Sequence, residues 1–212
     1  MEKINQEMVW NELAEKWSEY RKKPVAEVIE FLNGKKGKIL DLGCGGGRNF
    51  IKNDFIQIYG VDFSEKMLEL AEEKSQKEGI NAVLKKSGLE KLPFEDDFFD
   101  AALLISTLHC IEGENERKKA LEEMFRVMKK NSEGVISVWN KDEKASLRNI
   151  PAKEGLVNWQ KDGKNYQRYY YFYDKEELVN LLKSIGFRII EIEEKKEDSK
   201  HAKRNIVVIV RK

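Results

Sequence analysis

The sequence predicts an α/β fold in which a seven-stranded, mostly parallel sheet has helices on both faces. Strand-like and helix-like segments alternate from Lys38 to Trp139, which is the pattern of parallel strands joined by helical crossovers. The last two strand-like segments, 187–192 and 206–210, have no helix between them, so they must pair as an antiparallel hairpin. A glycine-rich turn follows directly on the first strand, where open α/β sheets bind ligands.

The individual elements follow from periodicity and capping residues. Apolar residues recur at helical spacing from Gln6 to Tyr20, and Pro24 can open a second helix from Val25 to Asn33, which Gly34 ends. Residues 141–168 look polar and irregular. Buried strands are expected at 38–42, 56–61, 81–85, 99–105 and 134–139, and helices at 65–77 after Ser64, at 114–129, and after Asp174 to residue 184.

Composition excludes several classes of protein. A chain of 212 residues with 41% hydrophobic and 10% aromatic residues is not disordered. No apolar run approaches the roughly 20 residues of a membrane helix, and the first residues lack the apolar core of a secretory signal. Two cysteines, Cys44 and Cys110, argue against a disulfide framework or an all-cysteine zinc site, and no metal site is expected. We therefore expect a cytoplasmic protein.

The net charge of +1 hides an asymmetry along the chain. Residues 141–212 hold 17 Lys or Arg and 12 Asp or Glu, whereas the first 140 residues hold 22 and 26. The charge is mostly Lys (30) and Glu (28), against only 5 Gln. This composition is typical of proteins from thermophiles, although a generic solvated surface would look similar.

The most specific motif is the glycine-rich turn Asp41-Leu42-Gly43-Cys44-Gly45-Gly46-Gly47-Arg48-Asn49, which should precede a helix. Gly43 and Gly45 allow a tight turn and leave room for a ligand against bare backbone. Asp62 ends the next strand, where an acid can accept both hydroxyls of a ribose. The spacing matches neither a dinucleotide-binding turn nor a P-loop. Together these features predict a ligand that carries adenosine.

This pattern resembles the first motif of class I S-adenosylmethionine (SAM) methyltransferases, which have a Rossmann-like fold. Further matches are Val61-Asp62-Phe63-Ser64 with Met67, Leu92-Pro93-Phe94, and Arg126-Val127-Met128-Lys129. The resemblance implies that Asp62 binds the ribose and that Phe63 and Met67 flank the adenine. It implies one domain, with a helical cover (1–35), a SAM-binding core (36–140), a substrate-side insertion (141–173), and a final helix and hairpin (174–212). The cofactor-binding residues expected on this basis are Tyr20, Arg21, Asp41, Gly43, Cys44, Gly45, Gly47, Asn49, Asp62, Phe63, Met67, Ser87, Gly88, Leu89 and Ser106.

One position departs from the family pattern. Ser87 stands where members commonly have an acid that meets the adenine amino group. The Ser87 hydroxyl can still accept a hydrogen bond from an amino group, or Glu90 can reach in instead. At the other side of the cofactor, Arg21 is a candidate for binding the cofactor's carboxylate; the alternative is an ordinary surface cation.

Two stretches bear on the methyl acceptor. His109 follows the fourth strand, where it could act as a base or contact the substrate, or simply fill a packing position. Residues 159–173 are rich in aromatic side chains, with Lys161, Lys164 and Arg168 among them. Aromatic faces stack on unpaired bases and cations meet phosphates, but the same pattern suits a strand whose alternate rings fill the core.

A narrower resemblance combines Trp17-Ser18-Glu19-Tyr20-Arg21, Leu108-His109, Val138-Trp139 and Arg168-Tyr169-Tyr170. Together they are similar to tRNA wobble-uridine methyltransferases that esterify a 5-carboxymethyl group. Tyr171 and Cys110 depart from that pattern, since His is more usual at both positions. The resemblance implies His109 and Arg168 as catalytic residues, tRNA as partner rather than DNA or a membrane, and room for a small zinc-binding activator protein. Substrate contacts are expected from Arg21, His109, Trp139, Lys164, Arg168, Tyr169 and Tyr170.

Two other functions stay open at this point. One is methylation of a small molecule such as a quinone precursor, with the aromatic segment as an apolar lid. The other is a catalytically silent module that keeps the SAM fold and binds RNA or a partner. A carboxylate acceptor would already be a nucleophile, so His109 and Arg168 would then orient substrate and no base would be needed.

Overall fold

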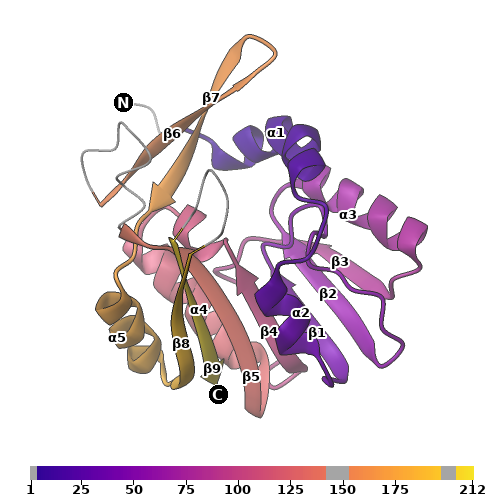
Figure 1. Cartoon of the computed structure of the whole chain (residues 1–212), viewed down its shortest axis with the longest axis vertical. Coiled ribbons are helices and arrows are strands. Elements are labelled where there is room, and N and C mark those ends of the chain that lie inside the picture. Colours follow the sequence, from indigo (N-terminus) through magenta and orange to yellow (C-terminus); the bar gives the residue numbers. More distant parts are fainter. Residues whose placement is uncertain (1–3, 142–152, 197–203) are drawn as a thin grey trace.

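A computed structural model describes residues 4–141, 153–196 and 204–212, and its centre is a seven-stranded sheet (Figure 1). The strand order is β3-β2-β1-β4-β5-β9-β8. The first five of these strands are parallel, and β9 pairs antiparallel with both neighbours. The predicted mixed sheet and its C-terminal hairpin are therefore confirmed. The strands are β1 (Gly37–Leu42), β2 (Ile56–Asp62), β3 (Ala82–Lys86), β4 (Phe99–Ile105), β5 (Met128–Trp139), β8 (Arg188–Lys196) and β9 (Arg204–Arg211).

Three of the α-helices in the described ranges begin at a capping side chain, and two end at a glycine. Side chains of Asn5, Ser64 and Asp174 accept hydrogen bonds from the first turns of α1, α3 and α5, respectively. Gly79 and Gly186 end α3 and α5 in the left-handed conformation. The helices are α1 (Gln6–Tyr20), α2 (Ala26–Leu32), α3 (Glu65–Glu78), α4 (Glu114–Val127) and α5 (Lys175–Ile185), with a short 3₁₀ turn, η1, at Leu108–Cys110.

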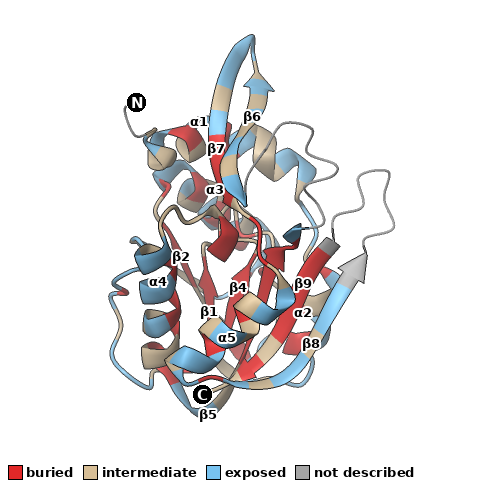
Figure 2. Ribbon diagram, turned by 90° about the vertical axis from the view of Figure 1, so that its left-hand side faces the viewer, coloured by how far each residue is buried: buried red, intermediate tan, exposed pale blue. Residues whose placement is uncertain are grey.

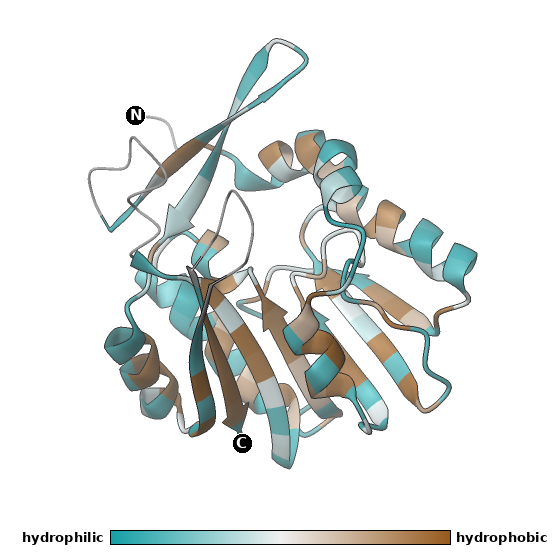
Figure 3. Cartoon of the chain, in the orientation of Figure 1, coloured by the Kyte–Doolittle hydropathy of each residue, from teal (hydrophilic) through white to brown (hydrophobic). Residues whose placement is uncertain are grey.

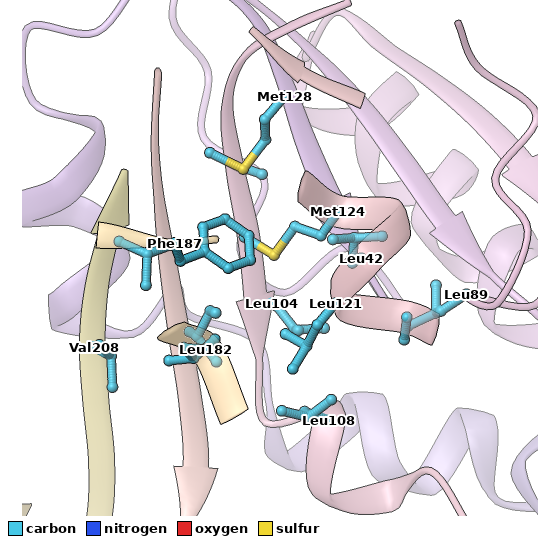
Figure 4. Close-up of a cluster of buried hydrophobic side chains, with 14 of the residues drawn as sticks. Leu42, Leu89, Leu104, Leu108, Leu121, Met124, Met128, Leu182, Phe187 and Val208 are labelled. Atoms are coloured by element: carbon cyan, nitrogen blue, oxygen red, sulfur yellow. The ribbon is translucent and has the colours of Figure 1, made fainter. Parts of the chain in front are cut away.

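The hydrophobic core has two halves, one on each face of the sheet. On one face, Leu42 and Leu104 pack against α4 and α5 (Figure 4), and Leu40 belongs to the same cluster. On the other face, Ile39 and Leu103 pack against α2 and α3. Side chains of successive residues in one strand point into opposite halves of the core, as a sheet covered on both faces requires. Buried residues and hydrophobic residues are accordingly concentrated in the central strands (Figures 2 and 3).

The helix expected directly after the glycine-rich turn is absent, and this prediction is wrong. Residues 43–55 form turns and irregular segments instead. Gly43, Gly45 and Gly47 all have positive φ, at 68°, 52° and 72°. A right-handed helix cannot include such residues, so the local glycine conformation prevents one from starting here.

The irregular segment expected at 141–168 is also wrong for the part that the structure describes; residues 142–152 lie outside it. Residues 154–171 form an antiparallel hairpin of β6 (Glu154–Lys161) and β7 (Lys164–Tyr171). Asp162 and Gly163 form its two-residue loop, both with positive φ. An Asp-Gly pair in which both residues have positive φ is preferred in two-residue hairpin loops. The hairpin rises beyond the sheet, beside α1 (Figures 1 and 2).

Side-chain and backbone hydrogen bonds attach the hairpin to α1. Lys161 Nζ donates to the carbonyl oxygen of Glu12 at 2.6 Å, and the Tyr169 N–H donates to Gln6 Oε1 at 3.1 Å. Trp159 of β6 contacts Trp17 of α1 edge-on, with ring centroids 5.7 Å apart. The N-terminal helix and the hairpin therefore form one cover over the end of the sheet. None of the helices in the described ranges is long and apolar enough to cross a membrane.

Phe99→Ala should destabilise the fold by about 3–5 kcal/mol, because it leaves a cavity in the core. Phe99 is fully buried, and its ring meets those of Tyr59, Phe94 and Phe98 edge-on. Urea unfolding measures the free energy. Phe55→Ala is the matched control, since Phe55 is 68% exposed and its loss should cost about 0.5 kcal/mol or less. Equal effects of the two substitutions would contradict the core assignment.

Candidate functional site

A cavity of about 650 Å³ lies at the carboxyl ends of the parallel strands. It sits where the strand order reverses between β1 and β4, the usual ligand position in an open α/β sheet. Eleven of the residues predicted to bind a cofactor line it. They are Arg21, Gly43, Cys44, Gly45, Asn49, Asp62, Phe63, Met67, Gly88, Leu89 and Ser106. The predicted residues Tyr20, Asp41, Gly47 and Ser87 are not in its lining.

The glycine turn presents bare backbone to this cavity. The amides of Gly43 and Cys44 both donate to the carbonyl oxygen of Val61, which folds the turn back onto β2. A Cβ atom on Gly43 would lie 2.2 Å from the Thr107 side chain, and the φ of Gly43 is +68°. Both the space and the backbone conformation therefore require glycine at position 43.

Asp62 is held in place by the same turn. Its Oδ2 accepts the Gly45 N–H and its Oδ1 accepts the Ser64 N–H, each at 2.9 Å. Burial raises the pKa of Asp62 to about 6, while these backbone donors oppose the shift. The carboxylate is thus oriented at the cavity wall, where it can accept hydrogen bonds from a diol.

Asp41 lies beneath the turn, outside the cavity lining. It is 1% exposed, and its Oδ2 has no hydrogen-bond partner in the described part of the chain. Burial, and then the nearby charge of Asp62, raise the pKa of Asp41 to about 7, against the opposing charge of Lys74. Two carboxyl groups with raised pKa values are therefore present, Asp62 at the cavity wall and Asp41 beneath the glycine turn, and a cationic ligand in the cavity would favour their ionised forms.

Glu90, and not Ser87, faces the cavity at the expected adenine position. The Ser87 hydroxyl lies 2.8 Å from the Gly88 carbonyl oxygen and 3.0 Å from that of Lys91, so its hydrogen bonds stay within its own loop. The Glu90 carboxylate lies over the backbone of Gly88 and lines the cavity. Glu90 is thus placed to accept from an amino group.

A second cavity, of about 690 Å³, adjoins the first and shares Trp17, Arg21, Arg48 and Ser106 with it. α1, the hairpin and the ends of β5 and β9 enclose it. Four cationic side chains and one carboxylate, Glu27, are in its lining, so its potential is positive. The cations are Lys16, Arg21, Arg48 and Arg168, and the other lining residues include Tyr20, Trp139, Trp159 and Asn205.

Arg168 is the most buried of these cations, at 3% exposure. Its guanidinium carbon lies 4.8 Å from the ring centroids of both Trp17 and Trp159, 5.1 Å from that of Tyr170 and 5.7 Å from that of Trp10. Within the described residues, its Nε and Nη1 have no hydrogen-bond partner. Aromatic faces stabilise the cation, but they leave its hydrogen-bond donors free for an anion.

Arg21 stacks on the same indole, with its guanidinium carbon 4.1 Å from the Trp17 ring centroid. Burial lowers the pKa of Arg21, and the charges of Arg48 and Arg168 lower it further. Such like-charge crowding costs free energy unless an anion relieves it. The second cavity is therefore suited to a carboxylate or a phosphate.

The remaining predicted residues lie outside both cavities. His109 is 1% exposed; its Nδ1 accepts the Trp139 N–H at 3.2 Å and its ring stacks with those of Trp139 and Tyr170. The Tyr169 hydroxyl accepts from Arg117 at 3.1 Å and bonds to Glu154. Lys164 is exposed beside the hairpin loop. His109 therefore supports Trp139, which does line the second cavity. In the described ranges, no group of three or more His, Cys, Asp or Glu side chains could hold a metal ion.

Sequence reasoning did not single out Arg48, Trp10 or Asn205, which the fold brings to the site. Arg48 stands inside the glycine motif, next to predicted residues. Trp10 looks like an ordinary core position of an amphipathic helix. Only the packing of α1 on the hairpin shows that its indole faces Arg168.

Comparison with known proteins identifies the family. A family model described as a methyltransferase domain matches residues 40–136. The ubiquinone/menaquinone biosynthesis C-methyltransferase UbiE of Campylobacter jejuni is 30% identical over 198 residues, which cover 81% of this chain and 79% of that protein. This chain belongs to the SAM-dependent methyltransferases. A crystal structure of a SAM-dependent methyltransferase from Methanosarcina mazei shares the fold, with a TM-score of 0.74 at 22% identity over 89% of this chain and 98% of that one.

Two other relatives carry the same printed name, tRNA (carboxymethyluridine(34)-5-O)-methyltransferase. The protein from Schizosaccharomyces pombe is 28% identical over 210 residues, which cover 86% of this chain and 88% of that protein. The protein from Arabidopsis thaliana is 36% identical over 101 residues. That match covers 48% of this methyltransferase and 24% of the much longer plant protein.

The cofactor of the methyltransferase is SAM, and the first cavity fits it. Asp62 can accept the ribose hydroxyls, and the glycine turn leaves its backbone open to the ligand. The unpartnered carboxylate oxygen of Asp41 supplies negative potential for a ligand that carries an ammonium and a sulfonium. Glu90 lines the same cavity, and its carboxylate can accept a hydrogen bond from an amino group.

We predict that the free energy of unfolding of the SAM-free protein falls as pH rises from 5 to 8. Asp41 has a folded pKa of about 7 against an unfolded value of 3.8, so the folded state binds more protons between these limits. Its stabilising contribution is present at low pH and is lost as pH rises through 7. Asp41→Asn should flatten the profile by on the order of 2 kcal/mol. Urea unfolding at pH 5 and 8 tests this, with exposed Asp54→Asn as the control; a wild-type slope in Asp41→Asn would contradict it.

Glu90→Gln should weaken SAM binding about tenfold, the cost of one hydrogen bond to a charged acceptor. Ser87→Ala should change affinity less than twofold, because the Ser87 hydroxyl bonds within its own loop. Isothermal titration calorimetry measures both constants. A larger loss in Ser87→Ala than in Glu90→Gln would assign the adenine contact to Ser87 instead.

Proposed function

We propose that the methyltransferase esterifies the carboxylate of a modified wobble uridine in tRNA. The observation that carries this proposal is the buried, hydrogen-bond-deficient guanidinium of Arg168 in a positive cavity that adjoins the SAM cavity. A carboxymethyl group is an anion of the size that one guanidinium binds. Ser106 lines both cavities and marks the boundary between them.

The lining of the second cavity agrees with a carboxylate acceptor. When bound, SAM supplies an electrophilic methyl group, and an ionised carboxylate can attack it without a base. Among the described residues around this cavity, no histidine is present and Glu27 is the one carboxylate. Arg168 and Arg21 would instead position the carboxylate and replace its lost hydration. His109 would act through Trp139 by fixing one wall of the cavity.

tRNA is the proposed carrier of this acceptor. The Schizosaccharomyces pombe relative, which this chain matches over most of its length, is named as a carboxymethyluridine methyltransferase acting on tRNA. The projecting hairpin carries the exposed Lys164 beside its loop, which could contact a polyanion. A small zinc-binding activator protein stays a prediction of the resemblance.

A small-molecule acceptor is the second candidate. The Campylobacter relative named for ubiquinone and menaquinone biosynthesis is matched over 79% of its length. The indoles of Trp17, Trp139 and Trp159 could hold a quinone-like ring in the second cavity. The arginines favour the anionic nucleoside over a neutral ring.

The decisive experiment uses two anticodon stem-loop RNAs that differ only at the wobble base, which is 5-carboxymethyluridine or uridine. With labelled SAM, we expect label only in the first RNA, as an alkali-labile methyl ester seen by nucleoside mass spectrometry. Label in a quinone-precursor extract and none in RNA would establish the second candidate. SAM binding with no transfer to any acceptor would indicate a silent module.

Arg168→Ala should lower kcat/KM for the carboxymethyl RNA about 100-fold, the usual cost of a lost charge-assisted hydrogen bond. Arg168→Lys should recover part of the loss, because it restores the charge without the planar donor pair. SAM affinity should stay within twofold, which shows that the variant is folded. Exposed Arg188→Ala, at the far edge of the sheet on β8, is the matched control. Wild-type kinetics in Arg168→Ala would contradict the carboxylate role.

A further inference from the structure

Two aromatic side chains stand at the mouth of the second cavity. Tyr20 ends α1 and is 69% exposed, and Trp159 faces it from β6. Their ring centroids lie 6.4 Å apart at an angle of 66°, and both rings line the cavity. An aromatic ring this exposed, next to a second ring and in a cavity that three arginines also line, has free surface for stacking a flat ligand.

Unpartnered polar atoms lie in the wall below this mouth. Asn205, which pairs with Trp139 in the sheet, is 8% exposed and lines the cavity. Its Oδ1 is buried and lacks a hydrogen-bond partner among the described residues. The same holds for Nε1 of Trp159 and for Nε and Nη1 of Arg168. Leaving such groups unpaired is costly, so a concentration of them around one cavity points to a ligand.

We propose that Tyr20, Trp159 and Asn205 form the subsite for a uracil-type base that carries the carboxylate. The base stacks at the Tyr20–Trp159 mouth, its ring N–H donates to Asn205 Oδ1, and its carboxylate reaches Arg168. This inference rests on the proposed function and adds the residues that select the base. The N–H requirement separates a uracil from a quinone, since a quinone ring has carbonyl oxygens and no N–H donor.

The chemistry of the three contacts differs, which makes each one testable by itself. Stacking requires an aromatic ring at position 20 but not its hydroxyl group, so Tyr20→Phe should leave the affinity for the nucleoside nearly unchanged. The contact to Asn205 requires a ring proton, which methylation at N3 of the base removes. The contact to Arg168 requires the carboxylate, which plain uridine lacks.

The test measures binding of 5-carboxymethyluridine to the protein loaded with S-adenosylhomocysteine, by quenching of tryptophan fluorescence. Tyr20→Ala should weaken binding about tenfold and Tyr20→Phe less than twofold. Phe55→Ala is the control, because Phe55 is equally exposed but lies outside both cavities. Asn205→Ala should weaken binding about fivefold. The N3-methylated nucleoside should bind the wild type about as weakly as 5-carboxymethyluridine binds Asn205→Ala. Its affinity should not fall further in Asn205→Ala.

The outcomes separate this inference from the proposed function. If the wild type methylates the carboxymethyl RNA but Tyr20→Ala and Asn205→Ala have the wild-type KM for it, the assignment of the base subsite is overturned and the proposed function stands. If the wild type neither binds the nucleoside nor methylates the RNA, both fail. An unchanged affinity for the N3-methylated nucleoside would overturn the Asn205 contact in the same way.

Discussion

The organisation of the substrate side depends on one buried cation, Arg168. Its guanidinium lies among indoles from α1 and β6 and the Tyr170 ring, so the contact joins the first helix to the hairpin. Several cation–π contacts at ordinary strength, about 0.5–2 kcal/mol each, hold these elements together without using the cation's hydrogen-bond donors. The cover over the sheet and the proposed anion-binding group are therefore the same structure, and an anion that binds there would also reinforce the cover.

The two cavities have opposite electrostatics, and this division matches the two halves of the reaction. Carboxylates outnumber arginines around the first cavity, as suits a cationic cofactor, and cations dominate the second. The charge asymmetry along the sequence does not build this division. Three of the four cations around the second cavity, Lys16, Arg21 and Arg48, come from the first 140 residues, which are acidic overall. Packing of α1 and the glycine turn, and not local composition, brings them to Arg168.

Most of the fold could be predicted from the sequence, because strong periodicity and capping act locally. The bounds of α1 and β4 match the expected ones to the residue. The prediction of a helix after the glycine turn was wrong because three glycines adopt positive φ there. The alternation of strands and helices in the sequence does not reveal those backbone angles. The β6–β7 hairpin was missed although Asp162-Gly163 is a strong turn signal, since the polar residues of β6 looked irregular. Asp62 was predictable from spacing, whereas the aromatic partners of Arg168 come from α1 and from the hairpin, which are far apart in the sequence.

The contrast between His109 and Arg168 shows what decides a role at this site. Both are buried beside Trp139 or Tyr170, and both were expected to be catalytic from the resemblance to the wobble-uridine methyltransferases. His109 accepts the Trp139 N–H and stacks in the aromatic layer, so its polar group is used inside the protein. Arg168 has donors left over, and it lines a cavity. A buried polar group that the fold leaves unsatisfied beside a cavity can be paired by a ligand, and on this ground we propose the substrate contact for Arg168 and a supporting role for His109.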